Sequence, residues 1–594
     1  MDLLNHQFRL AARPEGLPKP TDWQYTEEPV PEPGEGEAVI KILYISLDPA
    51  MRGWMNAGRS YIAPVGIGDV MRSFSAGRVV ASNHPGLSVG DHVSGLLGVQ
   101  EYAVANGDAV VEIPTSVGFC MYVRRDCLME TGPFREDVFA QGYGEENDFC
   151  LRARHLGWRH MAATGIFVSH IGGQSFGAAR THLLQRNLTL LERLHPGYGA
   201  LIRQHVDADP LAPARSRLDL ARWQTQRRPK RGSRSVIIIT HDEGGGVERQ
   251  VQARIRALSA AGLTPIILRP LGDGICQLEP GIPVGNPWQD DFPNLTFALP
   301  SQIVALSRFL KRERPQHIEL HHRLGHDHAV HELPQRLGVP LDIYVHDYAA
   351  ICPRVTLVTT TQRYCGEPDT SECETCIADL GSRLREEIAV AALRRRTATD
   401  FAAARQVIFP SDEVERRFRR YLGDFASAIH PWEEDGPVTP RPSTRSTPRQ
   451  AGRWRIAVIG ALGTEKGYDV LLACARDAAR RSLPLEFIVI GFTHDDLRLE
   501  DTGHVRITYR FDPERAVAEI ASQSCDLAFI PSIWPETWCF ALSDAWKAGL
   551  KTAVLDIGTP AQRVGNTGNG WVLPLALPPS NLNNTLISLA QSAN

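Results

Sequence analysis

From Ser235 onward, short runs of β-branched residues alternate with amphipathic stretches, and this alternation limits the folds open to the chain. The runs include SVIIIT (235–240), TPIILRP (264–270), HIELHH (317–322), DIYVHD (342–347) and QVIFPS (406–411). Strands that alternate with helices predict a parallel sheet covered by helices. The same pattern restarts at Arg455 with RIAVIGALG and continues to TAVLDIG. We therefore expect two Rossmann-like α/β halves.

The length and charge of the chain set further limits. A chain of 594 residues is too long for one hydrophobic core, and at roughly 100 to 200 residues per domain about three to five domains are expected. The 64 basic and 68 acidic residues nearly cancel, so nothing indicates a nucleic-acid partner. No run of eighteen apolar residues exists, and the start MDLLNHQFRL does not resemble an export signal. We expect a cytoplasmic protein, and peripheral contact with the inner face of the membrane is an open alternative. The sequence does not predict the oligomeric state.

Composition shifts divide the chain into four folded segments and two linkers. The expected segments are a mostly β domain (1–114), a partial α/β module (115–205), a linker (206–234), an α/β half (235–432), a second linker (433–453) and a second α/β half (454–594). The first linker carries Arg227, Arg228, Lys230, Arg231 and Arg234. A solvated basic connector is the favoured interpretation, and contact with phosphate or anionic lipid is the alternative.

The last segment holds the sharpest candidate site. In open α/β sheets a ligand binds beyond the carboxyl ends of the strands. There GALGTEKG places Gly460, Gly463, Lys466 and Gly467, whose backbone N–H groups and ammonium can hold a diphosphate, although such a turn is often only a turn. PSIWPETWCFALSDAWKAGL places Glu536 and Asp544 at a helix start. They can bind two hydroxyls, or they can be a dipole-balancing acid and a surface acid.

The order of these motifs resembles the family 4 glycosyltransferases of the GT-B fold. GALGTEKGYDVLL, FIVIG, PSIWPETW, SDAWKAG and DIGTPAQRVGNTGNGWVLP follow one another as in that family. The resemblance implies a nucleotide-diphosphate sugar donor, with Lys466 on the pyrophosphate, Glu536 and the Thr537 backbone on the sugar and phosphates, and Asp544 on the ribose. The chain departs from the family at Ala461, where many members have Arg, and at Asp544, where Glu is usual.

The preceding half resembles the partner domain of the same family. Gly244, Gly245 and Gly246 follow a strand and open a helix, and the resemblance places Gly245 and Gly246 near the donor phosphates and acceptor. It also implies that His346 faces the reacting sugar, whereas a lone histidine at a strand end is more often structural. Retaining enzymes of this family need little from a protein base, because the leaving diphosphate assists the acceptor. No Mg²⁺ requirement is expected, since Lys and helix N-termini neutralise the diphosphate.

Four cysteines follow His346 within one segment. They are Cys352, Cys365, Cys373 and Cys376, and the last two form a CxxC pair. Three gaps and a terminal CxxC suit tetrahedral zinc, so a closed structural Zn²⁺ site is the leading hypothesis. Free buried thiols and disulfides are the alternatives.

The two upstream segments resemble parts of other enzymes. Residues 117–200 resemble the C-terminal half of a family 2, GT-A glycosyltransferase, with Glu146 in the position of the base and His170 near the metal or diphosphate. The acidic run around Glu146 is equally consistent with a solvated helix start. Residues 1–114 resemble the N-terminal GroES-like domain of zinc-independent, NADP-dependent medium-chain oxidoreductases. Neither segment is followed or preceded by the half that would complete it.

These features favour a glycosyltransferase within an apparent fusion protein. We expect transfer of a hexose-type sugar to a glycan or lipid-linked acceptor, with retention, in bacterial surface polysaccharide synthesis. The alternatives are an NADP-dependent oxidoreductase acting on enones or quinones, and an inactive fusion of binding modules.

Overall fold

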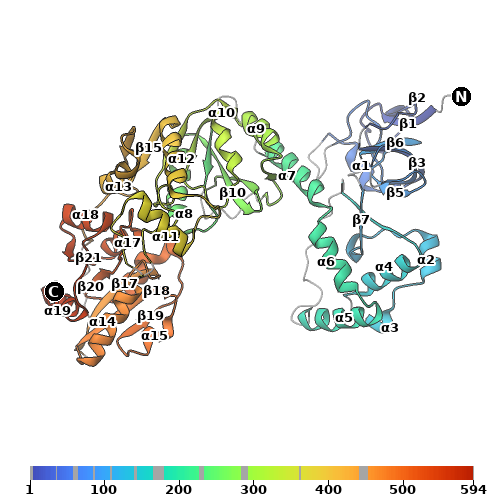
Figure 1. Ribbon diagram of the computed structural model, residues 1–594. Coiled ribbons are helices and arrows are strands. Elements are labelled where there is room, and N and C mark those ends of the chain that lie inside the picture. The colour runs from blue at the N-terminus through green and yellow to red at the C-terminus, as the bar shows by residue number, and fades with distance from the viewer. Residues whose placement is uncertain are drawn as a thin grey trace. The chain divides into compact units, whose positions relative to one another are not determined.

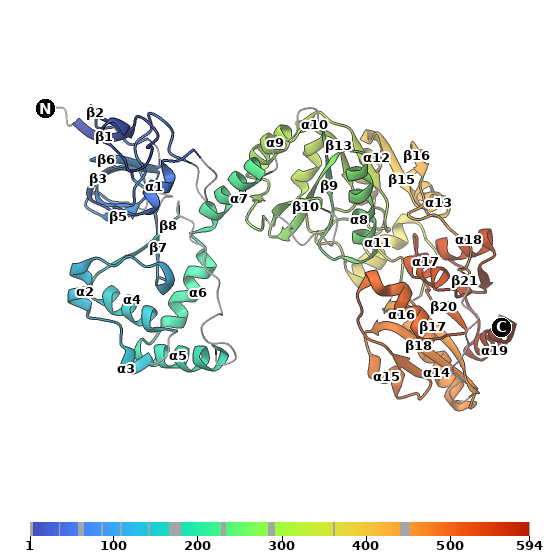
Figure 2. The ribbon, with the colours of Figure 1, turned by 180° about the vertical axis from the view of Figure 1, so that it is seen from behind.

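The chain forms two compact units, residues 1–226 and 227–594. The structure is a computed structural model, and it describes residues 4–34, 36–57, 64–84, 87–106, 110–139, 143–164, 180–226, 233–282, 292–359, 361, 363–439 and 452–592. Each unit is described by itself below (Figures 1 and 2). Within these described ranges, no helix has both the length and the apolar character that crossing a membrane requires.

The first unit begins with a mostly antiparallel β region (Figure 1). Its elements are β1 (Leu4–Leu10), β2 (Trp23–Pro29), β3 (Glu37–Ile45), α1 (Ala50–Trp54), β4 (Ser75–Ser82), β5 (His92–Gly95), β6 (Tyr102–Asn106) and β7 (Val110–Ile113). Four strands form a sheet in the order β5-β4-β3-β6, and β1 pairs with β2. Ala38 and Ile40 on β3 pack with Val79 on β4 in its core. The predicted β-rich domain is therefore confirmed.

The segment that resembles GT-A continues the same unit. Its elements are α2 (Arg125–Thr131), α3 (Glu136–Phe139), α4 (Glu145–His155), β8 (His160–Ala163), α5 (Arg180–Leu194), α6 (Tyr198–Ala208) and α7 (Ala212–Gln226). β8 pairs antiparallel with β7. Arg159 adds ion pairs to Glu112 at 2.8 Å and to Asp91 at 3.1 Å. The pairing of β7 with β8 and the ion pairs of Arg159 thus join the two upstream segments.

The predicted linker 206–234 is largely helical where the structure describes it. Helix α7 occupies Ala212–Gln226. Trp223 is fully buried, and Arg222 forms an ion pair at 2.7 Å with Asp219 one turn earlier. Ala, Leu and Arg are good helix formers, and burial of Trp223 adds packing energy that the Arg-rich composition did not suggest. Residues 227–232, with four of the five basic side chains noted above, lie outside the described residues.

The second unit begins with an eight-stranded sheet in the order β12-β11-β10-β9-β13-β14-β15-β16. Its strands are β9 (Ser235–Ile239), β10 (Thr264–Gly272), β11 (Ile275–Pro280), β12 (Thr296–Ala298), β13 (Pro315–Leu320), β14 (Leu341–Tyr344), β15 (Gln406–Phe409) and β16 (Ser427–Ile429). Its helices are α8 (Gly245–Ala260), α9 (Ile303–Arg312), α10 (Leu333–Leu337), α11 (Thr370–Leu380), α12 (Val390–Ala403) and α13 (Asp412–Leu422). β11 and β12 run antiparallel at one edge. Every residue of β9 is buried, as expected of a central parallel strand.

The remainder of the unit is a six-stranded parallel sheet in the order β19-β18-β17-β20-β21-β22 (Figure 2). Its strands are β17 (Trp454–Leu462), β18 (Leu485–Thr493), β19 (Val505–Ile507), β20 (Leu527–Ile530), β21 (Thr552–Leu555) and β22 (Gly570–Leu573). Its helices are α14 (Tyr468–Arg480), α15 (Asp496–Glu500), α16 (Ala516–Ser522), α17 (Phe540–Lys547), α18 (Gly558–Thr567) and α19 (Pro579–Ser592). This is the Rossmann strand order, so the predicted pair of α/β halves is confirmed.

In both sheets the order of the strands reverses at the first strand, so that later strands lie on both sides of it. β17 lies between β18 and β20, and β9 lies between β10 and β13. At such a switch point the loops beyond the carboxyl ends diverge and leave a crevice for a ligand. The loops to consider are therefore those after β17 and β20 in one half and those after β9 and β13 in the other.

Candidate functional site

Lys466 and Glu536 follow the two strands at the switch point of the C-terminal sheet. Lys466 lies in the loop after β17, and Glu536 lies in the loop after β20. The nearby Glu536 carboxylate raises the pKa of the Lys466 ammonium. The Ser532 hydroxyl donates a hydrogen bond to Glu536, which is largely buried. The loops thus present one cation and one oriented carboxylate at the place where the fold binds ligands.

Two glycines let these loops approach one another. Gly467 has φ +88°, and a Cβ there would lie 2.0 Å from the carbonyl oxygen of Pro531. Gly558 has φ +71°, and a Cβ there would lie 2.7 Å from the Glu536 nitrogen. No other residue fits such contacts, and glycine also adopts positive φ without strain. The position of Glu536 therefore depends on both glycines.

Asp544 lies on α17 and is bound by an arginine of the other half. Arg249 of α8 donates to its carboxylate oxygens at 2.7 and 2.9 Å and to Glu433 at 2.8 Å. Its guanidinium lies 4.5 Å from the Phe540 ring centroid. Burial opposes the charged form, but the hydrogen bonds to Asp544 outweigh it and raise the pKa of Arg249. Arg249 was not predicted from the sequence, although it directly follows the motif GGVE.

The described part of the predicted linker 433–453 is docked on the C-terminal half. Arg563 of α18 donates to Asp435 at 3.0 Å, and Lys547 pairs with Glu433 at 3.1 Å. The Thr439 N–H donates to the Trp546 carbonyl at 3.0 Å. The two acids hold this segment in place, and residues 440–451 lie outside the described residues.

We expect Arg249→Ala to lower the free energy of unfolding of the second unit by about 1–3 kcal/mol. The substitution leaves the carboxylates of Asp544 and Glu433 without their shared cation. Intrinsic tryptophan fluorescence during thermal or urea denaturation would measure the change. Arg256 lies on the same helix and is exposed, so Arg256→Ala is the matched control and should change stability by less than about 0.5 kcal/mol. Equal effects of the two variants would contradict a stabilising role for the contacts of Arg249 with Asp544 and Glu433.

His346 follows β14 and contacts the loop that carries Glu536. The Thr537 hydroxyl donates to the His346 carbonyl oxygen, and the Tyr348 hydroxyl donates to the Pro535 carbonyl at 2.7 Å. Burial and the neighbouring His321 lower the pKa of His346 well below its usual value. The imidazole is therefore neutral at pH 7 and lies where the two halves of the unit touch.

The glycine-rich loop meets the start of α17. Gly245 begins α8 with φ +71°, and a Cβ on Gly246 would lie 3.4 Å from the Phe540 ring. Gly463 opens the loop that ends at Gly467. The structure thus brings together predicted residues that lie far apart in the sequence: Gly246 meets the start of α17, Lys466 lies in the loop next to that of Glu536, and Thr537 contacts His346.

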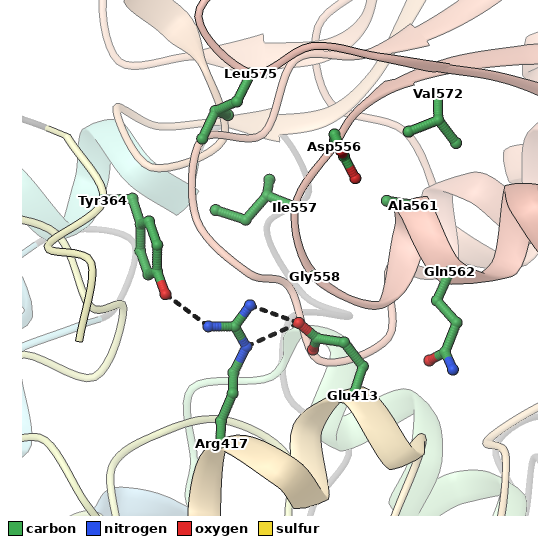
Figure 3. Close-up of a pocket in the computed structure, with 10 residues that line it drawn as sticks. All are labelled: Tyr364, Glu413, Arg417, Asp556, Ile557, Gly558, Ala561, Gln562, Val572 and Leu575. Atoms are coloured by element: carbon green, nitrogen blue, oxygen red, sulfur yellow. Dashed lines mark hydrogen bonds and ion pairs between the residues drawn. The ribbon is translucent and has the colours of Figure 1, made fainter. Parts of the chain in front are cut away.

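A pocket of about 450 Å³ lies between the two halves of the second unit (Figure 3). On one side of it Arg417 of α13 donates to Tyr364 at 2.7 Å and to Glu413, one turn earlier on the same helix, at 2.8 Å. Gly558 contributes to the wall, so the pocket adjoins the Glu536 loop. None of the predicted donor-binding side chains lines this pocket, so we do not place the donor there. Its lining residues are Tyr364, Glu413, Arg417, Asp556, Ile557, Gly558, Ala561, Gln562, Val572 and Leu575.

The four cysteines after His346 are free thiols, which removes the disulfide alternative. Burial raises the pKa of Cys352 and of Cys365 to about 11, and the other thiols of the group contribute. Cys373 accepts a hydrogen bond from Arg394 at 3.3 Å. Nowhere in the described ranges are three or more His, Cys, Asp or Glu side chains arranged to hold a metal ion. The zinc site stays a prediction.

The acidic run of the first unit is the start of helix α4. Asp148 is fully buried and binds Arg135 and Arg152, and the His195 Nε2 lies 2.8 Å from its carboxylate. The Gly144 N–H donates to Glu146 at 3.1 Å. These contacts stabilise the helix start and favour the structural interpretation of the run. His170 lies outside the described residues.

Three family models match the chain, and they agree with this architecture. "N-terminal domain of oxidoreductase" matches residues 6–113, "Glycosyltransferase Family 4" matches 244–432, and "Glycosyl transferases group 1" matches 442–592. Residues 244–592 therefore belong to the glycosyltransferases of the GT-B fold, fused to an oxidoreductase-type N-terminal domain. The resemblance of residues 117–200 to family 2 enzymes stays a prediction.

Individual relatives match in separate parts of the chain. The NADPH-dependent curcumin reductase of Escherichia coli (strain K12) is 44% identical over 109 residues, 18% of this chain and 32% of that protein. The structure of CurA from Vibrio vulnificus is 42% identical over 17% of this chain and 30% of that one, with a TM-score of 0.17. The match to the structure of Anabaena Alr3699/HepE in complex with UDP and glucose covers 61% of this chain and 92% of that chain, with 13% identity and a TM-score of 0.39. The chain thus spans about a third of the length of the curated reductase.

Proposed function

We propose that the second unit transfers a hexose-type sugar from a nucleotide-diphosphate donor to a glycan or lipid-linked acceptor, with retention at the anomeric carbon. The observation that carries the proposal is the position of Lys466 and Glu536 in the two loops at the switch point, where the carboxylate raises the pKa of the ammonium, next to the contact between Thr537 and His346. Transfer to a lipid-linked acceptor in surface polysaccharide synthesis would take place in the cytoplasm at the inner membrane face.

Each site residue receives one role in this proposal. Lys466 neutralises the diphosphate, Glu536 and the Thr537 backbone hold the sugar and phosphates, and Asp544 binds the ribose. Gly245 and Gly246 let the donor phosphates and the acceptor approach the backbone. Asp544 already binds Arg249 at 2.7 Å, and a carboxylate has about four lone-pair sites, so it can accept from ribose hydroxyls beside the arginine.

The chemistry asks mainly for positioning and charge stabilisation. Negative charge develops on the departing diphosphate, and a cation fixed beforehand stabilises it without reorganisation. Holding the acceptor hydroxyl beside the anomeric carbon removes most of the entropic cost of the encounter. His346 is neutral, so it can position a hydroxyl without adding a competing cation.

A transfer assay with UDP-, GDP- and dTDP-sugars on the full chain tests the proposal. Turnover of one donor is expected, together with a rise in the thermal midpoint when the matching nucleoside diphosphate is added, because a ligand that binds only the folded state stabilises it. Binding of NADPH with no turnover of any nucleotide sugar would favour a reductase instead. No stabilisation by any nucleotide would favour an inactive fusion.

We also propose a structural zinc ion on Cys352, Cys365, Cys373 and Cys376. The support is the spacing of the four cysteines with its terminal CxxC, together with the Glu367 N–H that donates to the Cys365 sulfur at 3.4 Å. Burial raises the pKa of Cys352 and of Cys365, so zinc would have to displace their protons, as a coordinating metal does. The four described thiols are not grouped around a metal position, so binding would also have to bring their sulfurs together.

We expect elemental analysis of the purified chain to find about one zinc per chain, and removal of one ligand to abolish it. Cys376→Ser should lose the metal and lower the thermal midpoint. Cys120 is exposed and lies in the other unit, so Cys120→Ser should keep both. Zinc retained in Cys376→Ser, or none in the parent chain, would contradict the site.

A further inference from the structure

A buried carboxylate lies behind the histidine of the candidate site. Glu319 on β13 has a fully buried side chain and binds Arg254 at 2.5 and 3.1 Å. Burial opposes its charge, but hydrogen bonds from His317, His321 and Arg254 outweigh this and hold the pKa of Glu319 below its usual range. Glu319 is therefore ionised and can only accept hydrogen bonds.

His321 connects this carboxylate to His346. Its Nε2 lies 3.4 Å from Glu319 Oε2, and its Nδ1 lies 2.9 Å from the Nε2 of His346. The ring stacks on Tyr344 with centroids 4.4 Å apart and an interplanar angle of 7°, which fixes its plane. Burial lowers the pKa of His321, so the imidazole is neutral with one N–H and one lone pair.

The position of the proton on each histidine ring follows from which of its partners can donate and which can only accept a hydrogen bond. The Glu319 carboxylate only accepts, so the N–H of His321 lies on Nε2 and donates to it. The Nδ1 of His321 then carries the lone pair. It accepts from His346, whose N–H must lie on Nε2. His346 is therefore left with Nδ1 as its acceptor nitrogen.

We propose that Glu319 and His321 are positioning residues that fix His346 as the neutral Nε2–H tautomer. The consequence for transfer rests on the proposed function: the Nδ1 of His346 accepts a hydrogen bond from a hydroxyl of a bound substrate. Without Glu319 and His321, the His346 ring populates two tautomers and two orientations. Only the Nε2–H tautomer in the observed orientation presents Nδ1 as an acceptor to the substrate.

The other nearby histidines are held by different partners. The Nε2 of His322 lies 3.0 Å from Asp347, and its Nδ1 accepts from the Leu324 N–H at 3.0 Å. The Nδ1 of His241 accepts from the Glu243 N–H at 3.1 Å. Neither ring replaces His321 beside His346, so the substitution of His321 addresses one contact.

The kinetic test compares two substitutions at one position. In His321→Asn the side-chain oxygen can take the place of Nδ1 and accept from His346, so kcat/KM for transfer should stay within about threefold of the parent. His321→Leu has no acceptor and should lower kcat/KM about tenfold, the effect of one lost hydrogen bond. His317 also contacts Glu319, at 3.2 Å, so His317→Leu is the control and should resemble His321→Asn. Equal losses in both leucine variants, or in both His321 variants, would overturn the proposal.

The tautomer can be measured without turnover. Nitrogen-15 NMR of the full chain labelled in histidine, with the His346 signals assigned from their loss in His346→Gln, should show Nε2 protonated and Nδ1 unprotonated. In Glu319→Gln the amide N–H can donate to His321, and the His346 pattern should reverse or become mixed. A protonated Nδ1 in the parent chain would overturn the inference. Failure of the transfer assay alone would instead count against the proposed function.

Discussion

Replacement of Lys466 by alanine is expected to lower kcat/KM for sugar transfer by about 10²- to 10³-fold, the usual cost of removing one preorganised group that stabilises developing negative charge. Lys466 lies at the switch point after β17, and the Glu536 carboxylate raises the pKa of its ammonium, so the charge is present at pH 7. Steady-state rates with the donor identified in the panel, in the parent chain and the variant, measure the effect.

Two further variants separate charge at this position from general damage. Lys551 precedes β21 in the same half, and its ammonium lies 5.8 Å from the Trp571 ring centroid. Lys551→Ala should therefore keep transfer within about twofold, since it removes a charge far from the strand ends of β17 and β20. Lys466→Arg keeps a cation with a different shape and should lose less than Lys466→Ala. A fully active Lys466→Ala would show that another group neutralises the diphosphate.

The α/β architecture was predictable because parallel strands leave a strong signal. A strand buried on both faces is almost continuously apolar, and Ser235–Ile239, with one serine followed by four β-branched apolar residues, is buried at every position. Each such run is followed by a loop at the carboxyl end of the strand. Ligands bind at this edge of an open sheet, so the sequence alone allowed us to predict that Lys466 and Glu536 lie at a binding site. The β-rich region at the start of the chain was predicted from short strand patterns bounded by glycine and proline, which are typical turn residues.

Contacts between distant segments were not predictable. Arg249 and Asp544 are 295 positions apart, and nothing local to either residue indicates the partner. Glu433 and Asp435 resemble solvated linker acids in sequence, yet they bind Arg249 and Arg563. Charged residues give no sequence signal of burial, because burial depends on a partner that folding supplies.

Helix α7 and the contact between Glu319 and His321 were not predicted from the sequence. Arginine-rich composition suggested a linker, whereas residues 212–226 form helix α7, in which Asp219 and Trp223 are buried. HIELHH was used only as a strand, although Glu319 and His321 lie on the same side of it by their spacing of two. An acid two residues before a histidine at the end of a predicted strand was the available signal, and we used that segment only to predict a strand.

Alanine at Gly467 is expected to lower the free energy of unfolding of the second unit by about 2–5 kcal/mol, because positive φ and steric overlap act together. The new Cβ would lie 2.0 Å from the Pro531 carbonyl oxygen and 2.7 Å from the Pro531 Cβ, so the loop after β20 must move. That loop carries Glu536, and transfer should fall with stability. Thermal and urea denaturation of the full chain, followed by tryptophan fluorescence, measure the loss.

Gly503 separates the two contributions. It also has positive φ, at +68°, but a Cβ there would meet nothing within 4 Å. Gly503→Ala should therefore cost only about 1 kcal/mol, the price of the backbone conformation for a residue with a side chain. The difference between the two variants is the steric contribution of the contact between the loops after β17 and β20. If both variants unfolded at the same midpoint, the close approach of Gly467 to Pro531 would not hold the two loops together, and the placement of Glu536 beside Lys466 would need another cause.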